Sequence, residues 1–216
     1  MYTLDGLPVL TAEVTLRRTG AWFARLEVEA SDREPADGRL QLVLGSLRLV
    51  GTALADHAGA SLGRWRGLVV GGAARFRDVL DPASYVNVPL RVPLQDILRA
   101  TGDALASDAT TATLATQLQA WSRDRAPAGD LLVRLCSEAG CTWRTTTSGD
   151  VWVGTDDFLD VTPDVAHELV ETDEARGRVV IATEHPDPAL LPGTSFRGLR
   201  SEEHTSELQS RQYLVC

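Results

Sequence analysis

The chain has 216 residues, of which 44% are hydrophobic and 24% are charged, values that are ordinary for a globular protein with a buried core. Its formal net charge is −9 and it shows no basic stripe, which argues against specific nucleic-acid binding, because duplex affinity comes largely from neutralised phosphates. No apolar run approaches the roughly 18 residues that a membrane-spanning helix needs, and no signal peptide begins the chain. We therefore expect a protein made in the cytoplasm, with no membrane partner.

Alternating apolar and polar residues predict strands through most of residues 1–88. Two alternating runs flank a short turn at Gly20, which is the pattern of an antiparallel hairpin. A third run is interrupted at Gly45, so it forms either two strands or one strand with a bulge. The expected strands span residues 10–17, 22–28, 40–44, 47–49, 64–70 and 85–88. So many short strands predict an antiparallel β-barrel or sandwich for residues 1–88.

Residues 89–154 are predicted to form a small inserted α+β module, and its first element is a helix. Prolines at positions 89 and 93 favour an extended lead-in, and Pro93 also suits the first turn of a helix. The apolar face of this helix consists of Leu94, Ile97 and Leu98, at positions i, i+3 and i+4. Gly102 stands where a left-handed glycine would end the helix.

Two further helices and a hairpin complete the predicted module. Leu114, Leu118 and Trp121 follow the i, i+4, i+7 spacing of a second amphipathic helix. A third helix begins near Asp130, whose charge favours the positive end of the helix dipole, and it ends at Gly140. Its apolar face is formed by Leu131, Leu132, Leu135 and Cys136. Residues 142–146 and 151–153 then pair as strands, and we expect Trp143 and Trp152 to pack against the third helix.

After the module, residues 155–200 are expected to return to the β-domain, with strands at residues 178–183 and from residue 194 onward. Residues 200–210 read RSEEHTSELQS, which matches the in-frame translation of a common short-read sequencing adapter. We therefore interpret residues 201–216 as an artefactual tail from library preparation that adds nothing to the fold. On this interpretation the natural gene continues past Leu199 and the chain is an N-terminal fragment.

Three short motifs resemble catalytic or metal-binding signatures, and each fits a structural role better. Residues 59–63, GASLG, match G-x-S-x-G, but a strand follows Ser61, whereas a nucleophile elbow needs a helix there. Residues 167–171, HELVE, carry Glu171 in place of the second histidine of H-E-x-x-H. Asp156 and Asp157 are adjacent, so on a strand they would point to opposite faces and form a poor acid–base pair.

The cysteines and tryptophans are also expected to be structural. Cys136 and Cys141 straddle the end of the third helix, and no other metal ligands lie nearby in the sequence. A disulfide framework is not expected in a chain with only 3 cysteines, the last being Cys216. The tryptophans sit in periodic patterns typical of core packing, although a sugar-binding platform is an alternative: Trp22, Trp65, Trp121, Trp143 and Trp152. The sequence thus predicts no catalytic, cofactor-binding or metal-binding residue.

The segment from Leu90 to Gly154 resembles the baseplate hub proteins of phage tails and prophage-like particles. The resemblance rests on VPLRVPLQDILRATGD, QAWSR and AGDLLVRLCSEAGCTWRTTTSGDVWVG, and on the later PGTSFRG. It implies a tail-tube-like β-barrel with a small α+β insertion. It also implies a homotrimeric ring in the virion tail, assembled in the host cytoplasm, that links the tail tube, tape-measure and spike proteins. The family offers no catalytic residue in this stretch to carry over.

Two functions of other classes stay open from the sequence: a tail-associated peptidoglycan hydrolase and a carbohydrate-binding β-domain. Buried tryptophans would argue against the second. For the ring, we expect the strands within residues 10–28 and 40–70 to build the wall. Their outer faces carry Phe23, Arg25, Arg64 and Arg66, which suit protein contact because aromatic residues and arginine are enriched at interfaces.

Overall fold

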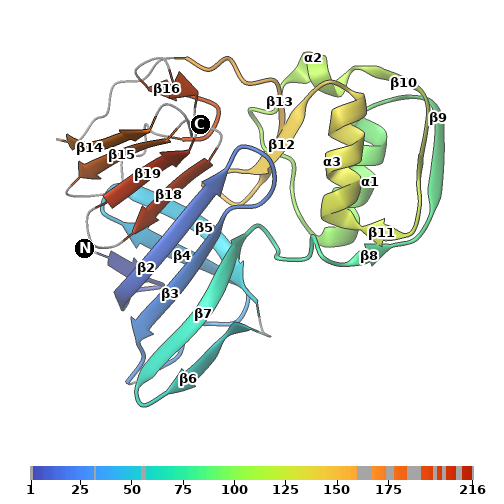
Figure 1. Cartoon of the computed structure of the whole chain (residues 1–216). Coiled ribbons are helices and arrows are strands. Elements are labelled where there is room, and N and C mark those ends of the chain that lie inside the picture. The colour runs from blue at the N-terminus through green and yellow to red at the C-terminus, as the bar shows by residue number, and fades with distance from the viewer. Residues whose placement is uncertain are drawn as a thin grey trace.

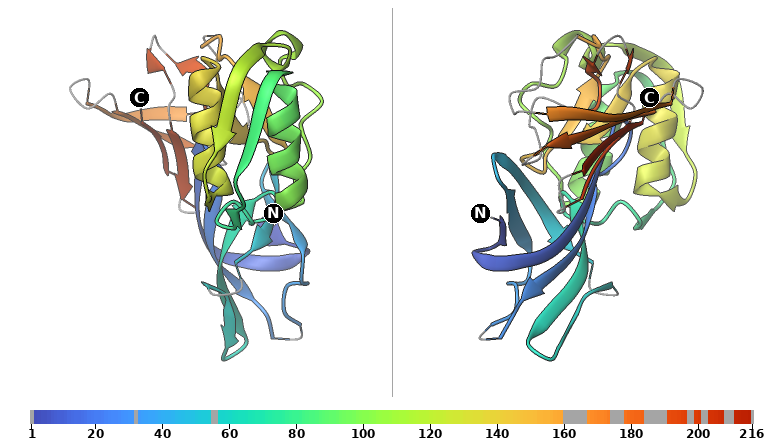
Figure 2. Two further views of the ribbon diagram at one scale, coloured as in Figure 1. Left: turned by 90° about the vertical axis from the view of Figure 1, so that its right-hand side faces the viewer. Right: turned by 60° about the vertical axis from the view of Figure 1, so that its left-hand side comes forward.

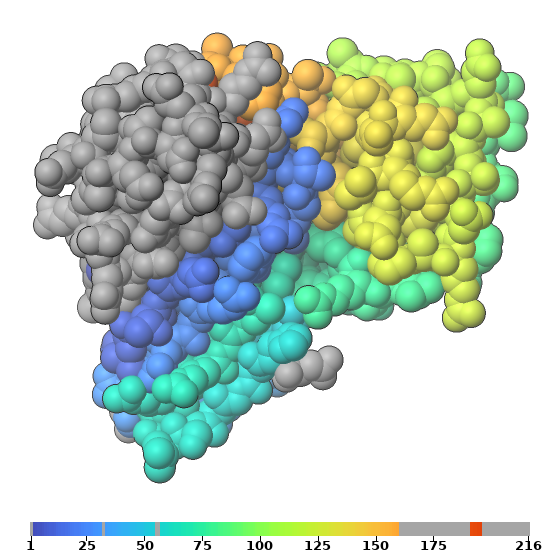
Figure 3. Space-filling model, in the orientation of Figure 1, coloured from blue at the N-terminus to red at the C-terminus, as the bar shows by residue number. Residues whose placement is uncertain are grey.

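The computed structural model describes residues 2–31, 33–54, 57–159, 167–173, 178–183, 191–196, 199–200, 203–207 and 211–215. The backbone forms a β-barrel, an α+β module beside it, and further strands that extend one side of the barrel (Figure 1). In the space-filling view the barrel and the module are two lobes that meet along one side (Figure 3).

Six antiparallel strands close the barrel in the order β1-β4-β5-β7-β3-β2, and pairing of β1 with β2 completes the circle. The strands are β1 (Tyr2–Leu4), β2 (Leu7–Arg17), β3 (Phe23–Glu29), β4 (Arg39–Leu44), β5 (Leu47–Ala53) and β7 (Arg64–Gly71). A short strand, β6 (Gly59–Ser61), pairs with β7 outside this circle. The predicted α+β class, with an antiparallel barrel and an inserted module, is confirmed.

The alternation in the sequence decides which side chains fill the barrel. In β4 and the first half of β5, every second residue is a leucine that is at most 2% exposed, and the residues between them are more exposed. Burial of one such side chain contributes roughly 2 kcal/mol, so the alternating pattern alone supplies much of the barrel core. Gly45 adopts a φ of 63° in the turn between β4 and β5, so the interrupted run is a hairpin of two strands.

The module contains helices α1 (Arg91–Thr101), α2 (Thr111–Leu114) and α3 (Ala128–Glu138). Its strands are β8 (Val79–Leu80), β9 (Ala83–Pro89), β10 (Gln117–Arg123), β11 (Ala126–Pro127), β12 (Thr142–Thr145) and β13 (Val151–Gly154). The predicted apolar faces of α1 and α3 are buried, and Gly102 ends α1 with a φ of 77°. Because α1 already begins at Arg91, the extended lead-in stops at Pro89, earlier than the two prolines predict.

The second predicted helix is wrong beyond its first turn. The helical segment α2 ends at Leu114, and residues from Gln117 onward form β10, which pairs with β9. Leu118 and Trp121 are both buried although they are three residues apart, a spacing that normally places strand residues on opposite faces. The β9–β10 ladder is interrupted opposite Gln119, where Asn87 has a φ of 51°, and this irregular step turns both side chains toward the helices.

The strand predicted at residues 85–88 was expected in the β-part of the chain, but it is β9 and belongs to the module, together with β8, for which no strand was predicted. Strand β8 pairs with β11 and β9 pairs with β10, so the barrel strands end at Gly71. Figure 2 (left) shows β9 and β10 lying between α1 and α3, on the side of the module away from the barrel. The ring of Tyr85 lies 5.7 Å from that of Trp121, which holds the pair of strands together on its helix-facing side.

The long strand β2 pairs with two different strands along one edge. Its first residues pair with β1, and residues 13–17 pair with β18 (Glu203–Glu207). The sheet continues through β19 (Arg211–Val215), β15 (Arg178–Thr183) and β14 (His167–Asp173), which confirms the strand predicted at residues 178–183. A small hairpin joins β16 (Ser195–Phe196) to β17 (Leu199–Arg200).

Residues 201–216 were expected to add nothing to the fold, and the structure differs by giving them two strands. The physical reason is the unpaired edge that β2 presents beyond β1, since a free row of backbone N–H and C=O groups accepts any extended segment. The adapter origin of this segment stays a prediction.

The module joins the barrel through the β12–β13 hairpin. Trp22, which is 1% exposed, donates its indole N–H to the carbonyl of Thr146 at 3.1 Å and its backbone N–H to the Thr145 hydroxyl at 3.0 Å. Gly20, in the β2–β3 turn, exchanges backbone hydrogen bonds with Trp143 and Thr145 at 2.9 and 3.1 Å. The β2–β3 turn of the barrel is therefore hydrogen-bonded to strand β12 of the module, and this contact fixes the position of the module on the barrel.

Candidate functional site

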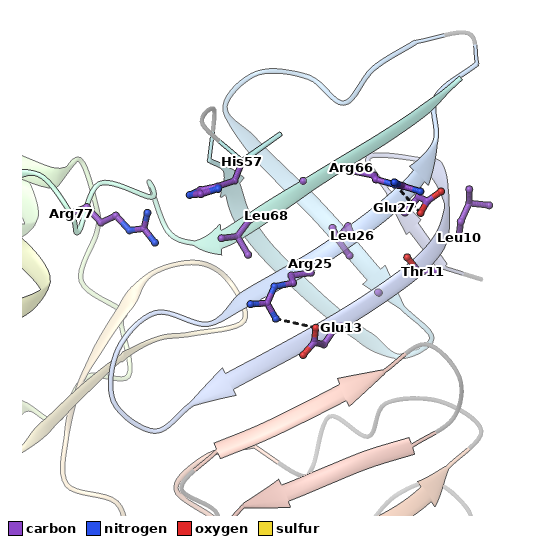
Figure 4. A pocket seen from close by; sticks show the side chains of 12 residues that line it. Leu10, Thr11, Glu13, Arg25, Leu26, Glu27, His57, Arg66, Leu68 and Arg77 are labelled. Atoms are coloured by element: carbon purple, nitrogen blue, oxygen red, sulfur yellow. Dashed lines mark hydrogen bonds and ion pairs between the residues drawn. The ribbon is translucent and has the colours of Figure 1, made fainter. Parts of the chain in front are cut away.

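The candidate functional surface is the outer face of the barrel over β2, β3 and β7. Its charged side chains alternate along each strand with core residues, so they project away from the barrel. We call the following five residues the charged face: Glu13, Arg25, Glu27, Arg64 and Arg66. Figure 4 shows four of them around an open hollow of about 770 Å³ that Leu10, Leu68, His57 and Arg77 also line.

Ion pairs link neighbouring strands across the charged face. Arg25 forms an ion pair with Glu13 at 3.1 Å. Glu27 forms ion pairs with Arg64 at 2.7 Å and with Arg66 at 3.1 Å. The hydrogen bonds from Arg64 and then Arg66 lower the pKa of Glu27 below its ordinary value, so this carboxylate stays charged at neutral pH. The three arginine side chains are 58% to 73% exposed, and ion pairs this exposed contribute little to folding because solvent screens them. Their guanidinium groups remain accessible to a partner.

An aromatic ring extends the charged face toward the β2–β3 turn. Phe23 is half-buried, with the guanidinium carbon of Arg17 at 4.9 Å from its ring centre and that of Arg25 at 5.8 Å. Phe23, Arg25, Arg64 and Arg66, predicted to form the wall of a ring, thus share one outer surface. Within the charged face itself, three residues are arginines and two are glutamates, in a chain whose net charge is −9.

Ser61 lies in a tight hairpin and not in a nucleophile elbow. It is the last residue of β6, is exposed, and is followed by Leu62 and Gly63 with φ of 53° and 71° before β7 begins. Positive φ at both central positions is typical of a two-residue hairpin turn. Gly63 therefore serves the turn, whereas Gly59 is the first residue of β6.

The HELVE motif falls in a strand. His167 begins β14, which pairs with β15 and has an irregular step between Leu169 and Glu171. A zincin motif needs its ligands on one face of a helix, and this backbone does not provide that arrangement. The side chains of the motif lie outside the described residues.

Asp156 is a buried bridging carboxylate. One oxygen lies 2.7 Å from Arg18 Nε and the other 2.6 Å from Arg144 Nη1, and the side chain is 1% exposed. It joins the segment after the module to the β2–β3 turn and to β12. The neighbouring Asp157 is not part of this cluster, so the two aspartates do not form an acid–base pair. Sequence reasoning missed the cluster because Arg18 lies 138 positions from Asp156.

Four of the five tryptophans are core residues. Trp22, Trp65, Trp121 and Trp143 are at most 5% exposed, which confirms core packing and argues against a sugar-binding platform. Trp143 joins the core that includes α3, as predicted. The prediction for Trp152 is wrong: it is half-buried, with the guanidinium carbon of Arg144 at 4.0 Å from its ring centre. In strand β13 the side chain of Trp152 points to the face opposite that of the buried Val151 and Val153, which explains why Trp152 does not join the core.

The two described cysteines are free thiols at the end of α3. Cys136 is buried and Cys141 is half-buried, while Cys216 lies outside the described residues. Within the described part of the chain, no group of three or more His, Cys, Asp or Glu residues is placed to hold a metal ion. None of the helices described there has the length and apolar character needed to cross a membrane.

Comparison with known proteins identifies the fold. No family model and no curated protein matches the chain. A 43 kDa tail protein of prophage MuSo2 from Shewanella oneidensis has a TM-score of 0.70 at 11% identity, covering 99% of this chain and 95% of that one. A tail protein from Neisseria meningitidis MC58 has a TM-score of 0.63 at 9% identity, with coverage of 99% and 95%.

A third solved structure belongs to a secretion machine. It is an E. coli component of the type VI secretion system described as structurally similar to the T4 bacteriophage tail proteins gp27 and gp5. Its TM-score is 0.66 at 15% identity, and the match covers 99% of this chain and 75% of that one. At these identities the likeness shows the fold alone. The chain therefore has the fold of phage and type VI secretion tail proteins, in agreement with the resemblance to baseplate hub proteins in its sequence.

Proposed function

We propose that the chain is a structural component of a tail baseplate hub, forming a homotrimeric ring that joins the tail tube to the tip or spike. Its partners are copies of itself and the tail-tube, tape-measure and spike proteins, and its place is the virion tail after assembly in the host cytoplasm. The proposal includes no cofactor, no membrane partner and no specific nucleic-acid partner.

The observation that carries this proposal is the closed barrel with its inserted module, a fold matched over 99% of the chain in two tail proteins and one component of a type VI secretion system. A closed barrel has no free edge within its circle, so it makes a rigid wall. The charged face adds exposed arginines beside a half-buried aromatic ring, a composition that is enriched where proteins meet.

We also propose that the chain acts by assembly and not by catalysis. The placement of Ser61 in a hairpin turn supports this view, because an elbow needs a strand followed by a helix. Ester or peptide hydrolysis by the purified protein that disappears in Ser61→Ala would overturn this part of the proposal.

Measuring the mass of the complete protein in solution tests the ring directly. Light scattering and native mass spectrometry at tens of micromolar are expected to give three copies, and electron microscopy a closed ring. A strict monomer under these conditions would rule out the hub function. A closed ring of another order would retain the assembly role and reject the trimer.

A further inference from the structure

The end of α3 brings two thiols together. The backbone N–H of Cys141 donates to the carbonyl of Cys136 at 2.9 Å, and the N–H of Gly140 donates to the carbonyl of Ser137 at 3.2 Å. These two bonds, with Gly140 at a φ of 68°, make a Schellman motif. In this motif the side chains at the positions of Cys136 and Cys141 contact each other, and the contact is usually apolar. Here two thiols occupy both positions, and both line the same hollow at the end of α3.

The two thiols differ in access and acidity. Cys136 is 2% exposed, whereas Cys141 is half-buried, and both line an open hollow of about 270 Å³ together with Thr19 and Ser137. The hydrogen bond between the thiols, followed by burial, raises the pKa of Cys136. The same hydrogen bond lowers the pKa of Cys141 below its ordinary value. Since the thiolate is the attacking species, Cys141 is the thiol that reacts first.

We propose that Cys136 and Cys141 are a modification site: they form an intrachain disulfide when the protein meets a small-molecule disulfide such as oxidised glutathione. The Cys141 thiolate attacks one glutathione sulfur, forms a mixed disulfide and releases one glutathione thiolate, which takes up the proton lost by Cys141. The Cys136 thiol then loses its proton to water and attacks the Cys141 sulfur, and the second glutathione leaves and is protonated. Two protein thiols are oxidised and one glutathione disulfide is reduced to two thiols.

The position of this site gives the disulfide a mechanical consequence. Cys141 directly precedes β12, and in β12 the carbonyl of Trp143 accepts a hydrogen bond from Gly20 of the barrel. The disulfide therefore ties the last turn of α3 to the strand that docks the module on the barrel. Because the loop that it closes is short, we expect a moderate rise in the thermal midpoint, by about 5 °C.

The experiment uses the whole chain with Cys216→Ser, which removes the third thiol. The protein is incubated with oxidised glutathione near pH 8, then its mass is measured and its remaining thiols are alkylated in denaturant. The expected product has lost two hydrogen atoms, carries no glutathione, resists alkylation at both cysteines and melts about 5 °C higher until dithiothreitol is added. Alkylation of both thiols after prolonged incubation, or a product that stops at a glutathione adduct, would overturn the proposal.

Single substitutions test the order of the steps. Cys136→Ser lacks the second thiol and is expected to accumulate a stable glutathione adduct on Cys141. Cys141→Ser retains only the buried thiol and is expected to stay unmodified in the folded state. Equal adduct formation in the two variants would reject the assigned roles. Circular dichroism shows whether each variant is folded, and Cys136→Ala replaces Cys136→Ser if the buried hydroxyl disturbs the helix. None of these readouts depends on ring assembly, so they stand apart from the proposed function.

Discussion

Trp22 joins the barrel to the module through two hydrogen bonds to residues at the end of β12. Its indole fits because Gly51 and Gly71 have no side chain: a Cβ atom would lie 2.7 Å from the indole at Gly51 and 2.5 Å from it at Gly71. We predict that Trp22→Ala lowers the free energy of unfolding by about 4 kcal/mol, since it leaves a large cavity and an unpaired carbonyl. Urea titration measures the loss. Trp152→Ala, at a half-buried tryptophan, is the control and should lose less than about 2 kcal/mol; equal losses would contradict this account of the joint.

Asp103 is a carboxyl group that the fold buries without full compensation. Oδ1 accepts the backbone N–H of Ala73 at 2.7 Å, while Oδ2 is buried with no hydrogen bond of good geometry among the described residues. Burial raises the pKa of Asp103 above its ordinary value, and the Ala73 hydrogen bond opposes this only in part. The folded state therefore binds the proton more tightly than the unfolded chain does. The stabilisation that comes from protonated Asp103 is fully present below the pKa that this group has in the unfolded chain. It is lost as the pH rises through the higher pKa that the group has in the folded protein.

We therefore predict that Asp103→Asn stabilises the protein at neutral pH, by on the order of 1 kcal/mol. The amide keeps an acceptor for Ala73 and removes the buried charge, so its advantage should shrink as pH falls from the raised folded pKa of Asp103 toward the ordinary carboxyl range, and it should change no further below that range. Thermal melts of both proteins across pH measure this. Asp108→Asn is the matched control, because that side chain is exposed. A destabilised Asp103→Asn at pH 7 would show that the carboxylate is better compensated than its geometry indicates.

At the scale of elements, those with local signals were predictable and those with long-range causes were not. Helices α1 and α3 carry their apolar spacing and terminal glycines within a few residues, so both were found with nearly correct bounds. Strand β10 was mistaken for a helix because Leu118 and Trp121 have helical spacing, and only pairing with β9 reveals the irregular step. Closure of the barrel through β1 likewise depends on pairing with β4, some forty positions away.

Strands β18 and β19 allow a prediction about the end of the chain. The barrel closes through β1 and β2 without them, so we predict that deleting residues 201–216 leaves the thermal midpoint unchanged within error. Calorimetry of the chain with and without this segment measures the effect. Loss of several degrees would show that pairing of β18 with β2 stabilises the fold, and it would count against the adapter origin of the segment.

At the scale of the whole molecule, the candidate surface was only partly readable from the sequence. Alternation placed Arg25, Arg64 and Arg66 on outer strand faces, because a strand fixes the facing of each residue. Their carboxylate partners depend on strand order: Glu27 meets Arg64 across 37 positions of sequence. The Asp156 cluster spans still more of the chain. The direction in which a side chain points from a single strand was therefore predictable, and ion pairs between residues of different strands were not.

The charged face leads to a prediction about assembly. Changing both Arg64 and Arg66 to Glu would leave one arginine among four acidic residues there, including Glu27 between two like charges. If this face meets a neighbouring subunit, reversal of its charge opposes association, because like charges across an interface cost several kcal/mol. We expect the apparent dissociation constant of the ring to rise more than about tenfold.

The control is the paired change Arg75→Glu and Arg134→Glu, which alters the net charge equally. These arginines lie beside β8 and on α3, where they pair with Asp78 at 2.7 Å and Asp124 at 3.4 Å. Both double variants lose ion pairs whose arginine side chains are at least 51% exposed, so thermal melts should show them folded. Light scattering across a dilution series and at two salt concentrations then compares assembly. If the charged face is an interface, only its own variant dissociates. If both variants assemble like the unaltered protein, the ring wall is built from another surface.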